Sequence, residues 1–96
     1  MEKPYRQLSI YLKKCRENSG ISQGEIAKYL GYTTPQFISN WERGLSSPPM
    51  DKLADLIKLI KIKPEIVLEL MSKDSIEILK HDFKRYKLIH SRKKAN

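Results

Sequence analysis

Three polar side chains, Gln36, Asn40 and Arg43, follow one another at spacings of four and three residues. In a helix, this spacing places them on one face. The amide groups of glutamine and asparagine each combine a hydrogen-bond donor with an acceptor, which suits the N7 and N6 edge of adenine. The pattern therefore indicates hydrogen bonding to an exposed polar partner rather than the making or breaking of bonds.

Few other residues carry groups that could do chemistry. Cys15 lies on an apolar stripe with Leu8 and Leu12, so we expect an inert core residue rather than a nucleophile. His81 and His90 are nine residues apart, which does not place them on one helical face for a metal. The sequence has no cysteine pair, no His-Glu-x-x-His pattern and no glycine-rich phosphate loop. We expect no enzymatic activity, no metal and no cofactor.

The chain is strongly basic, with 19 basic and 11 acidic residues and a net charge of +8. This balance favours a polyanionic partner, nucleic acid before an anionic membrane, although basic domains without such a partner are common. Residues 1–48 carry +3, residues 49–72 are neutral and residues 73–96 carry +5, so the two ends are the candidates for phosphate contact. One cysteine, no signal peptide and no membrane-spanning run predict a cytoplasmic protein.

Helical periodicity runs through the chain without strand or hairpin signals, which predicts an all-α fold. The apolar stripes and stop signals predict helices over residues 5–18, 22–31, 34–43 and 50–60, a short helix from 64, and a sixth helix over 74–90. Ser22 with Glu25, and Asp74 with Glu77, are typical of capping boxes, and Thr34 is typical of an N-cap.

The helices predicted at 22–31 and 34–43 are short and separated by only two or three residues. Two short helices joined by a tight, glycine-containing turn cross at a steep angle. This geometry pushes the second helix outward as a ridge, and a major groove about 12 Å wide accepts a helix. We expect Ile38 and Trp41 to anchor this ridge in the core, which leaves Gln36, Asn40 and Arg43 outside.

The chain resembles the Cro and lambda-repressor-like (XRE-type) helix-turn-helix family at Gln23, Ala27, Gly31, Ile38, Trp41, Glu42, Arg43 and Gly44. The resemblance covers roughly residues 8–71. It implies a five-helix DNA-binding domain over residues 1–72. Beyond the resemblance, the apolar periodicity and charge of residues 73–96 predict an additional C-terminal amphipathic helix and basic tail. It also implies a transcriptional regulator, with a repressor as the expected form, that binds double-stranded DNA as a homodimer.

The resemblance, and the residues that border the same surface, predict individual roles. Base contacts are expected from Gln36, Asn40, Thr34 and Ser39. Phosphate contacts are expected from Gln23, Thr33, Arg43, Ser46 and Lys52. The resemblance implies that Glu42 pairs with Arg16, whereas the alternative is that both are solvated surface charges. The corresponding alternative for the polar residues is an ordinary solvated surface.

Two features depart from the family pattern. The segment that follows Gly31 is one residue longer than usual, and Pro35 stands where relatives often carry a base-reading side chain. Because proline cannot read a base through hydrogen bonds, we expect a longer turn in which Thr33 or Thr34 contacts a phosphate or a thymine methyl group. Phe37 is expected in the core, with an apolar probe of the groove as the alternative.

The predicted C-terminal helix carries an apolar stripe that must be buried somewhere, formed by Ile76, Leu79, Phe83 and Tyr86. Three interpretations are open: a dimer interface, a helix folded back on its own domain, or an amphipathic helix that binds a membrane or partner. Dimerisation has a physical motive, because two recognition helices read half-sites about 34 Å apart.

We expect DNA and a second copy of the chain as partners, and no membrane. The alternative function is a protein-binding antitoxin or adaptor on the same scaffold. Residues 91–96 are expected to be frayed.

Overall fold

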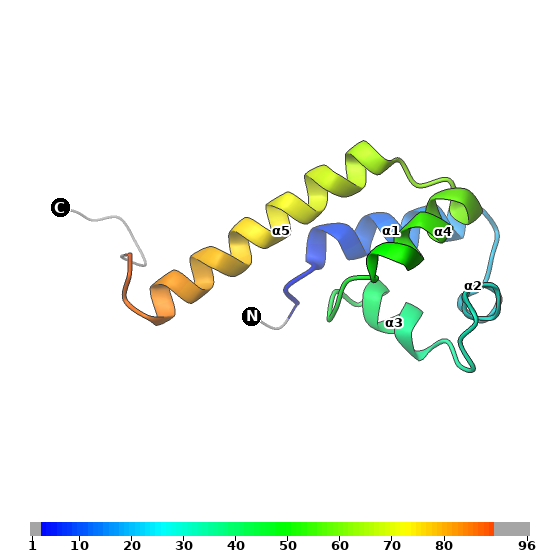
Figure 1. The fold of residues 1–96 in the computed structure, drawn as a ribbon, viewed down its shortest axis with the longest axis horizontal. Coiled ribbons are helices and arrows are strands. Elements are labelled where there is room, and N and C mark those ends of the chain that lie inside the picture. The colour runs from blue at the N-terminus through cyan, green and yellow to red at the C-terminus, as the bar shows by residue number, and fades with distance from the viewer. Residues whose placement is uncertain (1–2, 90–96) are drawn as a thin grey trace.

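The computed structural model describes residues 3–89, and every regular element within them is a helix (Figure 1). The elements are α1 (Arg6–Asn18), α2 (Gln23–Leu30), α3 (Gln36–Glu42), α4 (Met50–Ile60) and α5 (Pro64–Arg85). The predicted all-α fold class is confirmed. His90 and the predicted basic tail, residues 91–96, lie outside the described residues.

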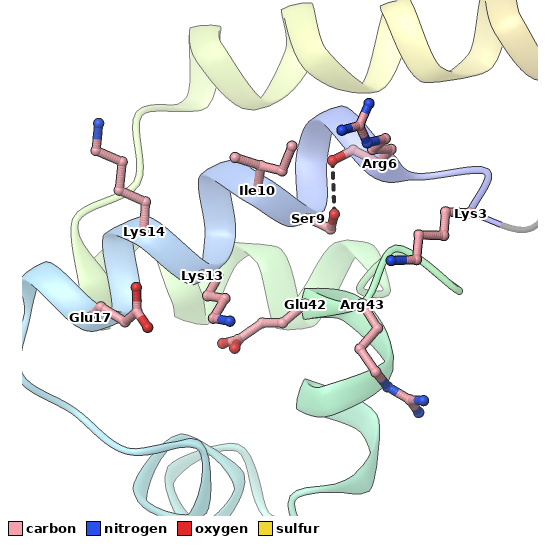
Figure 2. Close-up of a pocket in the computed structure, with 9 residues that line it drawn as sticks. All are labelled: Lys3, Arg6, Ser9, Ile10, Lys13, Lys14, Glu17, Glu42 and Arg43. Carbon is pink, nitrogen blue, oxygen red and sulfur yellow. Dashed lines mark hydrogen bonds between the residues drawn. The ribbon is translucent and has the colours of Figure 1, made fainter.

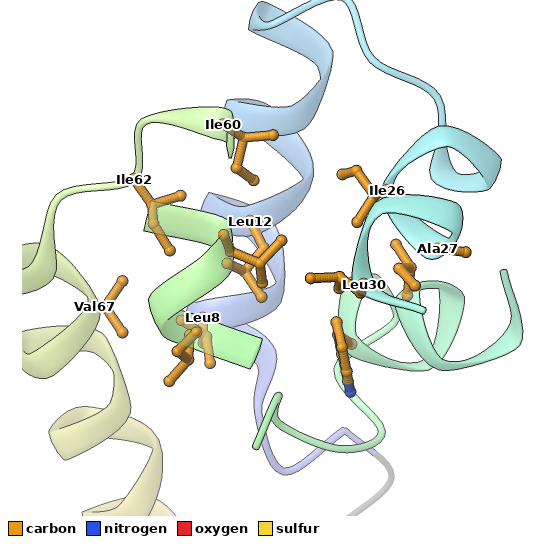
Figure 3. Close-up of a cluster of buried hydrophobic side chains, with 12 residues drawn as sticks. Leu8, Leu12, Ile26, Ala27, Leu30, Ile60, Ile62 and Val67 are labelled. Carbon is orange, nitrogen blue, oxygen red and sulfur yellow. The ribbon is translucent and has the colours of Figure 1, made fainter. Parts of the chain in front are cut away.

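One hydrophobic core holds these helices together (Figure 3). Helix α1 packs against α3 and α5, and α2 packs against α3. The buried apolar side chains are Leu8, Leu12, Ile26, Ala27, Leu30, Ile38, Trp41, Leu53, Leu56, Ile60, Ile62 and Val67. Cys15 is partly buried against this core, as expected for a residue that completes the stripe of α1.

Local sequence signals set both ends of α2. The predicted capping box is present: the Glu25 N–H donates to Ser22 Oγ at 3.0 Å, and the Ser22 N–H donates to Glu25 Oε1 at 2.9 Å. The hydrogen bond from the Ser22 backbone lowers the pKa of Glu25 below its usual value. Gly31 ends the helix in the left-handed region with φ of 85°, where a side chain would be strained.

Helix α5 is one continuous helix of 22 residues where the sequence predicted two. The predicted helix start at Asp74, and its capping box with Glu77, are therefore wrong. The Asp74 carboxylate is 3% exposed and accepts hydrogen bonds from the backbone N–H groups of Gln7 and Leu8, both at 3.0 Å. Because α1 has no side-chain cap at Tyr5, Asp74 satisfies these two N–H groups from another helix, where the helix dipole also favours a negative charge.

The sequence-based division between residues 1–72 and 73–96 falls within α5. The first half of this helix lies beside α1, and the second half extends past the rest of the chain (Figure 1). The segment that the sequence treats as an additional C-terminal helix is thus the continuation of the fifth helix.

Candidate nucleic-acid interface

Residues 31–35 form the turn that leads from α2 to α3. Pro35 is the N-cap of α3, since the Ser39 N–H donates to the Pro35 carbonyl at 2.9 Å, so the predicted N-cap at Thr34 is one residue too early. The Thr34 hydroxyl nevertheless accepts from the Gln36 N–H at 3.4 Å. Thr33 and Thr34 are both exposed, so the turn presents two hydroxyl groups and two methyl groups to solvent.

Helix α3 is fixed by its apolar side. Ile38 and Trp41 are buried in the core, which confirms the predicted anchor. Gln36 and Arg43 are exposed on the other side, and Asn40 and Ser39 are half-buried between them. The polar face that the sequence predicted is therefore turned outward.

The three polar side chains of this face form one hydrogen-bonded network. Gln36 Nε2 donates to Asn40 Oδ1 at 3.0 Å, and Arg43 Nη2 donates to the same oxygen at 2.7 Å. Within residues 3–89, Asn40 Nδ2 and Gln36 Oε1 have no partner in the protein. The guanidinium also keeps further N–H donors. The face thus offers a donor, an acceptor and a cation side by side, in positions that the network holds before a ligand arrives.

A second network lies at the base of α3 and connects three helices. Arg16 Nε donates to Glu42 Oε2 at 2.6 Å, and Arg16 Nη2 donates to Glu42 Oε1 at 3.0 Å. This is the pair that the resemblance implies, and its side chains are only 14% and 5% exposed. The hydrogen bonds to Glu42 raise the pKa of Arg16, so the guanidinium stays charged at any ordinary pH.

Gln23, expected at a phosphate, takes part in this second network. Its Nε2 donates to Glu42 Oε1 at 2.9 Å, and Arg16 Nη1 donates to the Ile21 carbonyl at 3.0 Å. The start of α2, the end of α1 and α3 are thus joined through one carboxylate. One amide hydrogen of Gln23 is used here, and the other is left for a ligand.

The sequence around this site matches a known protein family. Residues 12–67, more than half of the 96-residue chain, match the helix-turn-helix family. The chain belongs to the helix-turn-helix family. This match confirms the predicted XRE-type resemblance and supports a DNA-binding regulator. Neither the search of curated proteins nor the search of solved structures gave a match.

Two of the residues predicted to bind phosphate border the helix-turn-helix unit after α3. Ser46 is half-buried in the loop that leads to α4. Lys52 Nζ donates to the Leu30 carbonyl at 2.9 Å and lies 5.2 Å from the centre of the Tyr32 ring. Lys52 therefore caps the carbonyl end of α2, where a cation is favoured, and retains two N–H donors.

A groove of about 510 Å³ beside the helix-turn-helix unit was missed by the sequence reasoning (Figure 2). Its cationic lining residues come from α1, the segment before it and the end of α3: Lys3, Arg6, Lys13, Lys14 and Arg43. Glu17 and Glu42 are its acidic residues. The available signal was the seven-residue spacing of Arg6 and Lys13, which places both on one face of α1. This groove extends the positive surface from Arg43 onto α1.

Phe37 is not in the core, and the expectation that it would be is wrong. The side chain is 53% exposed, and its ring lies 4.8 Å from the ring of Tyr32. The longer turn before α3 places Tyr32 against the core, where it also contacts Trp41, and Phe37 stacks on the outer side of Tyr32. The aromatic ring therefore lies on the surface of α3, three residues before Asn40.

The C-terminal stripe is exposed. Ile76, Leu79 and Phe83 are 52%, 56% and 42% exposed, and Tyr86 is exposed as well. These values contradict the interpretation in which the stripe folds back on its own domain. In the part of the chain that the structure describes, no helix is long and apolar enough to cross a membrane, and no group of side chains is arranged to hold a metal ion.

Proposed function

We propose that this chain is a transcriptional repressor that inserts α3 into the major groove of double-stranded DNA and binds as a homodimer. The observation that carries the proposal is the network of Gln36, Asn40 and Arg43 on the outer face of α3. Side chains that are already held in place lose less conformational freedom on binding, which favours affinity and a defined register.

Base contacts are assigned to the residues at the centre of this face. Asn40 Nδ2 can donate to N7 of a purine, and the neighbouring Gln36 Oε1 can accept from the exocyclic amine of adenine. Thr34 and Ser39 flank the pair as weaker base contacts. Phe37, exposed beside them, suits the methyl group of thymine.

Phosphate contacts are assigned to the border of the same surface. Arg43 and Thr33 are exposed next to the base-reading pair, and Ser46 follows in the loop. Gln23 and Lys52 have partners within the protein, so each would bind a phosphate only through its remaining N–H groups. Such contacts fix the position of the protein on the duplex and carry no sequence information.

The exposed apolar stripe supports the dimer. Apolar side chains that the chain itself leaves uncovered at helical spacing are typical of an association surface. One copy presents one α3 and reads only a few base pairs, whereas two copies related by a twofold axis read two half-sites together.

Selection of bound sequences from random duplex DNA tests this function. We expect an enriched palindromic motif, and an affinity that falls steeply with salt. Asn40→Ala should cost about 1–3 kcal/mol of binding free energy and relax the preference at one base step. Asn18→Ala, an exposed asparagine at the end of α1, is the matched control and should leave the motif unchanged. An Asn40→Ala variant with unaltered affinity and motif would contradict the assignment.

A second candidate function, binding of a protein partner by the same scaffold, is favoured by the exposed ring of Phe37 on α3. Exposed aromatic side chains are enriched in protein interfaces. Phe37→Ala separates the two functions: it should change the preference at one thymine if α3 reads DNA. If the purified chain enriches no DNA sequence at all, the second candidate replaces the first.

A further inference from the structure

The second half of α5 extends past the other helices and is mostly exposed (Figure 1). Its last buried residue is Asp74, which is bonded to the first turn of α1. Beyond it, residues 75–89 form an arm in which only Ile78 and Asp82 are half-buried. Asp74 bonds α5 to α1 immediately before the arm, and the arm continues the direction of the helix past the rest of the chain (Figure 1).

An exposed apolar stripe follows one face of α5 and its C-cap, and the polar Ser72 interrupts it between Leu68 and Ile76. Its members are Leu68, Ile76, Leu79, Phe83 and Tyr86. At about 100° per residue, these five side chains fall within a sector of about 80°, and Asp74 and Val67 point about 150° away from its centre. The face of α5 that carries the stripe is thus different from the face that binds the chain's own core.

At Leu68 the stripe borders an apolar groove between α4 and α5. The groove has a volume of about 320 Å³, and its lining is almost wholly apolar: Met50, Leu53, Ala54, Ile57, Pro64, Val67, Leu68 and Met71. Leu68 belongs to both the groove and the stripe. An apolar occupant of this groove would therefore also contact the stripe at Leu68.

The charges along α5 favour one orientation of such an occupant. Residues 64–72 carry Glu65 and Glu69 and no basic residue. Residues 80–87 carry one acidic residue, Asp82, and the basic residues Lys80, Lys84, Arg85 and Lys87. Two copies of α5 side by side in the same direction would place like charges together, whereas opposite directions place the acidic segment of each beside the basic segment of the other.

We propose that two copies of this chain pair through antiparallel α5 helices, with Phe83 of each copy seated in the α4–α5 groove of the other. The proposal rests on the homodimer proposed above and specifies its interface. A twofold axis at Ile76 brings Leu68 within one residue of the level of the partner's Phe83, and Glu69 within one residue of the level of the partner's Lys84. Glu69 already pairs with Lys73 of its own helix at 3.1 Å on the surface, so it remains accessible to a second cation. Such a pairing is self-complementary and closes at two copies.

Disulfide cross-linking of the full chain without DNA tests the orientation. In a Cys15→Ser background, Ile76→Cys should cross-link with itself. Leu68→Cys and Phe83→Cys should cross-link only when the two variants are mixed. Self-cross-linking of Leu68→Cys together with self-cross-linking of Phe83→Cys would show parallel helices and overturn the proposal, as would the absence of any cross-link.

Sedimentation equilibrium tests the contacts themselves. Phe83→Asp should weaken self-association on the order of tenfold or more, because it places a charge in an apolar groove. Tyr29→Asp, at a somewhat more exposed aromatic residue on α2, is the matched control and should leave self-association unchanged. Glu69→Lys and Lys84→Glu should each weaken the dimer, and the double variant should restore it. A double variant weaker than both single variants would overturn the pairing.

The outcome for the interface is distinguishable from the outcome for DNA binding. If the wild-type chain binds a selected DNA half-site but stays monomeric, or fails the cross-linking test, the interface is wrong and the DNA-binding function stands. If the wild-type chain dimerises as expected but selects no DNA, the interface stands and the proposed function fails.

Discussion

Replacing Glu42 with alanine is expected to destabilise this protein more than any other single change at a charged residue. The carboxylate accepts hydrogen bonds from two nitrogens of Arg16 and one of Gln23, and its side chain is 5% exposed. Without it, the Arg16 guanidinium keeps its charge and its place but retains only the Ile21 carbonyl as a partner. A nearly buried cation without a counter-charge is far more costly than an exposed one.

The expected magnitude follows from the exposure of the two side chains. Breaking a buried ion pair by removing one partner costs about 3–5 kcal/mol. Because the Arg16 side chain keeps 14% exposure and some contact with water, we expect the lower end, about 3 kcal/mol. For a domain of this size, about 3 kcal/mol corresponds to a melting temperature lower by roughly 12–24 °C.

Thermal and urea unfolding followed by circular dichroism measure this change. Glu77→Ala is the matched control, since Glu77 pairs with Lys80 at 3.6 Å and both side chains are largely exposed. The control should cost less than about 1 kcal/mol. The double variant Arg16→Met, Glu42→Leu should recover much of the stability that Glu42→Ala loses. A Glu42→Ala variant that is no less stable than the Glu77→Ala control would refute the reasoning.

Three further predictions concern other parts of the structure. Asp74→Ala should lower the free energy of unfolding by about 1–3 kcal/mol and speed hydrogen exchange at the two α1 amides that Asp74 caps, because these amides lose their acceptor. Unchanged exchange rates at the two amides would show that water replaces the carboxylate. Burial raises the pKa of Tyr11 in the folded state above its usual value. The neutral Tyr11 side chain therefore contributes fully to stability below about pH 10, and this contribution is lost as the pH rises through the folded-state pKa. The fall in the urea midpoint above about pH 10 should be smaller in Tyr11→Phe, and an identical fall would contradict this. Gln23→Ala should weaken binding to all DNA sequences alike, and a changed motif in the selection assay would show instead that Gln23 reads bases.

The sequence by itself determined the elements whose signals are local. The capping box at Ser22 and the left-handed glycine at the end of α2 concern groups within four residues of each other, so the pattern defines the geometry. The spacing of Ile38 and Trp41 likewise determined which side of α3 is buried. These signals were enough to predict the helix-turn-helix unit, which the family match confirms.

Only the tertiary structure decided which partner each polar group takes. Asp74 has the residue type and sequence context of a helix start, but it lies in the middle of α5. A carboxylate can cap any helix N-terminus within its reach, and the first turn of α1 lies beside Asp74. The same reason explains the partners of two residues that were expected at phosphates: Gln23 binds Glu42, and Lys52 binds the carbonyl end of α2. A hydrogen-bonding side chain specifies the kind of partner that it needs, whereas the packing of distant segments determines which of the suitable partners lies within 3 Å.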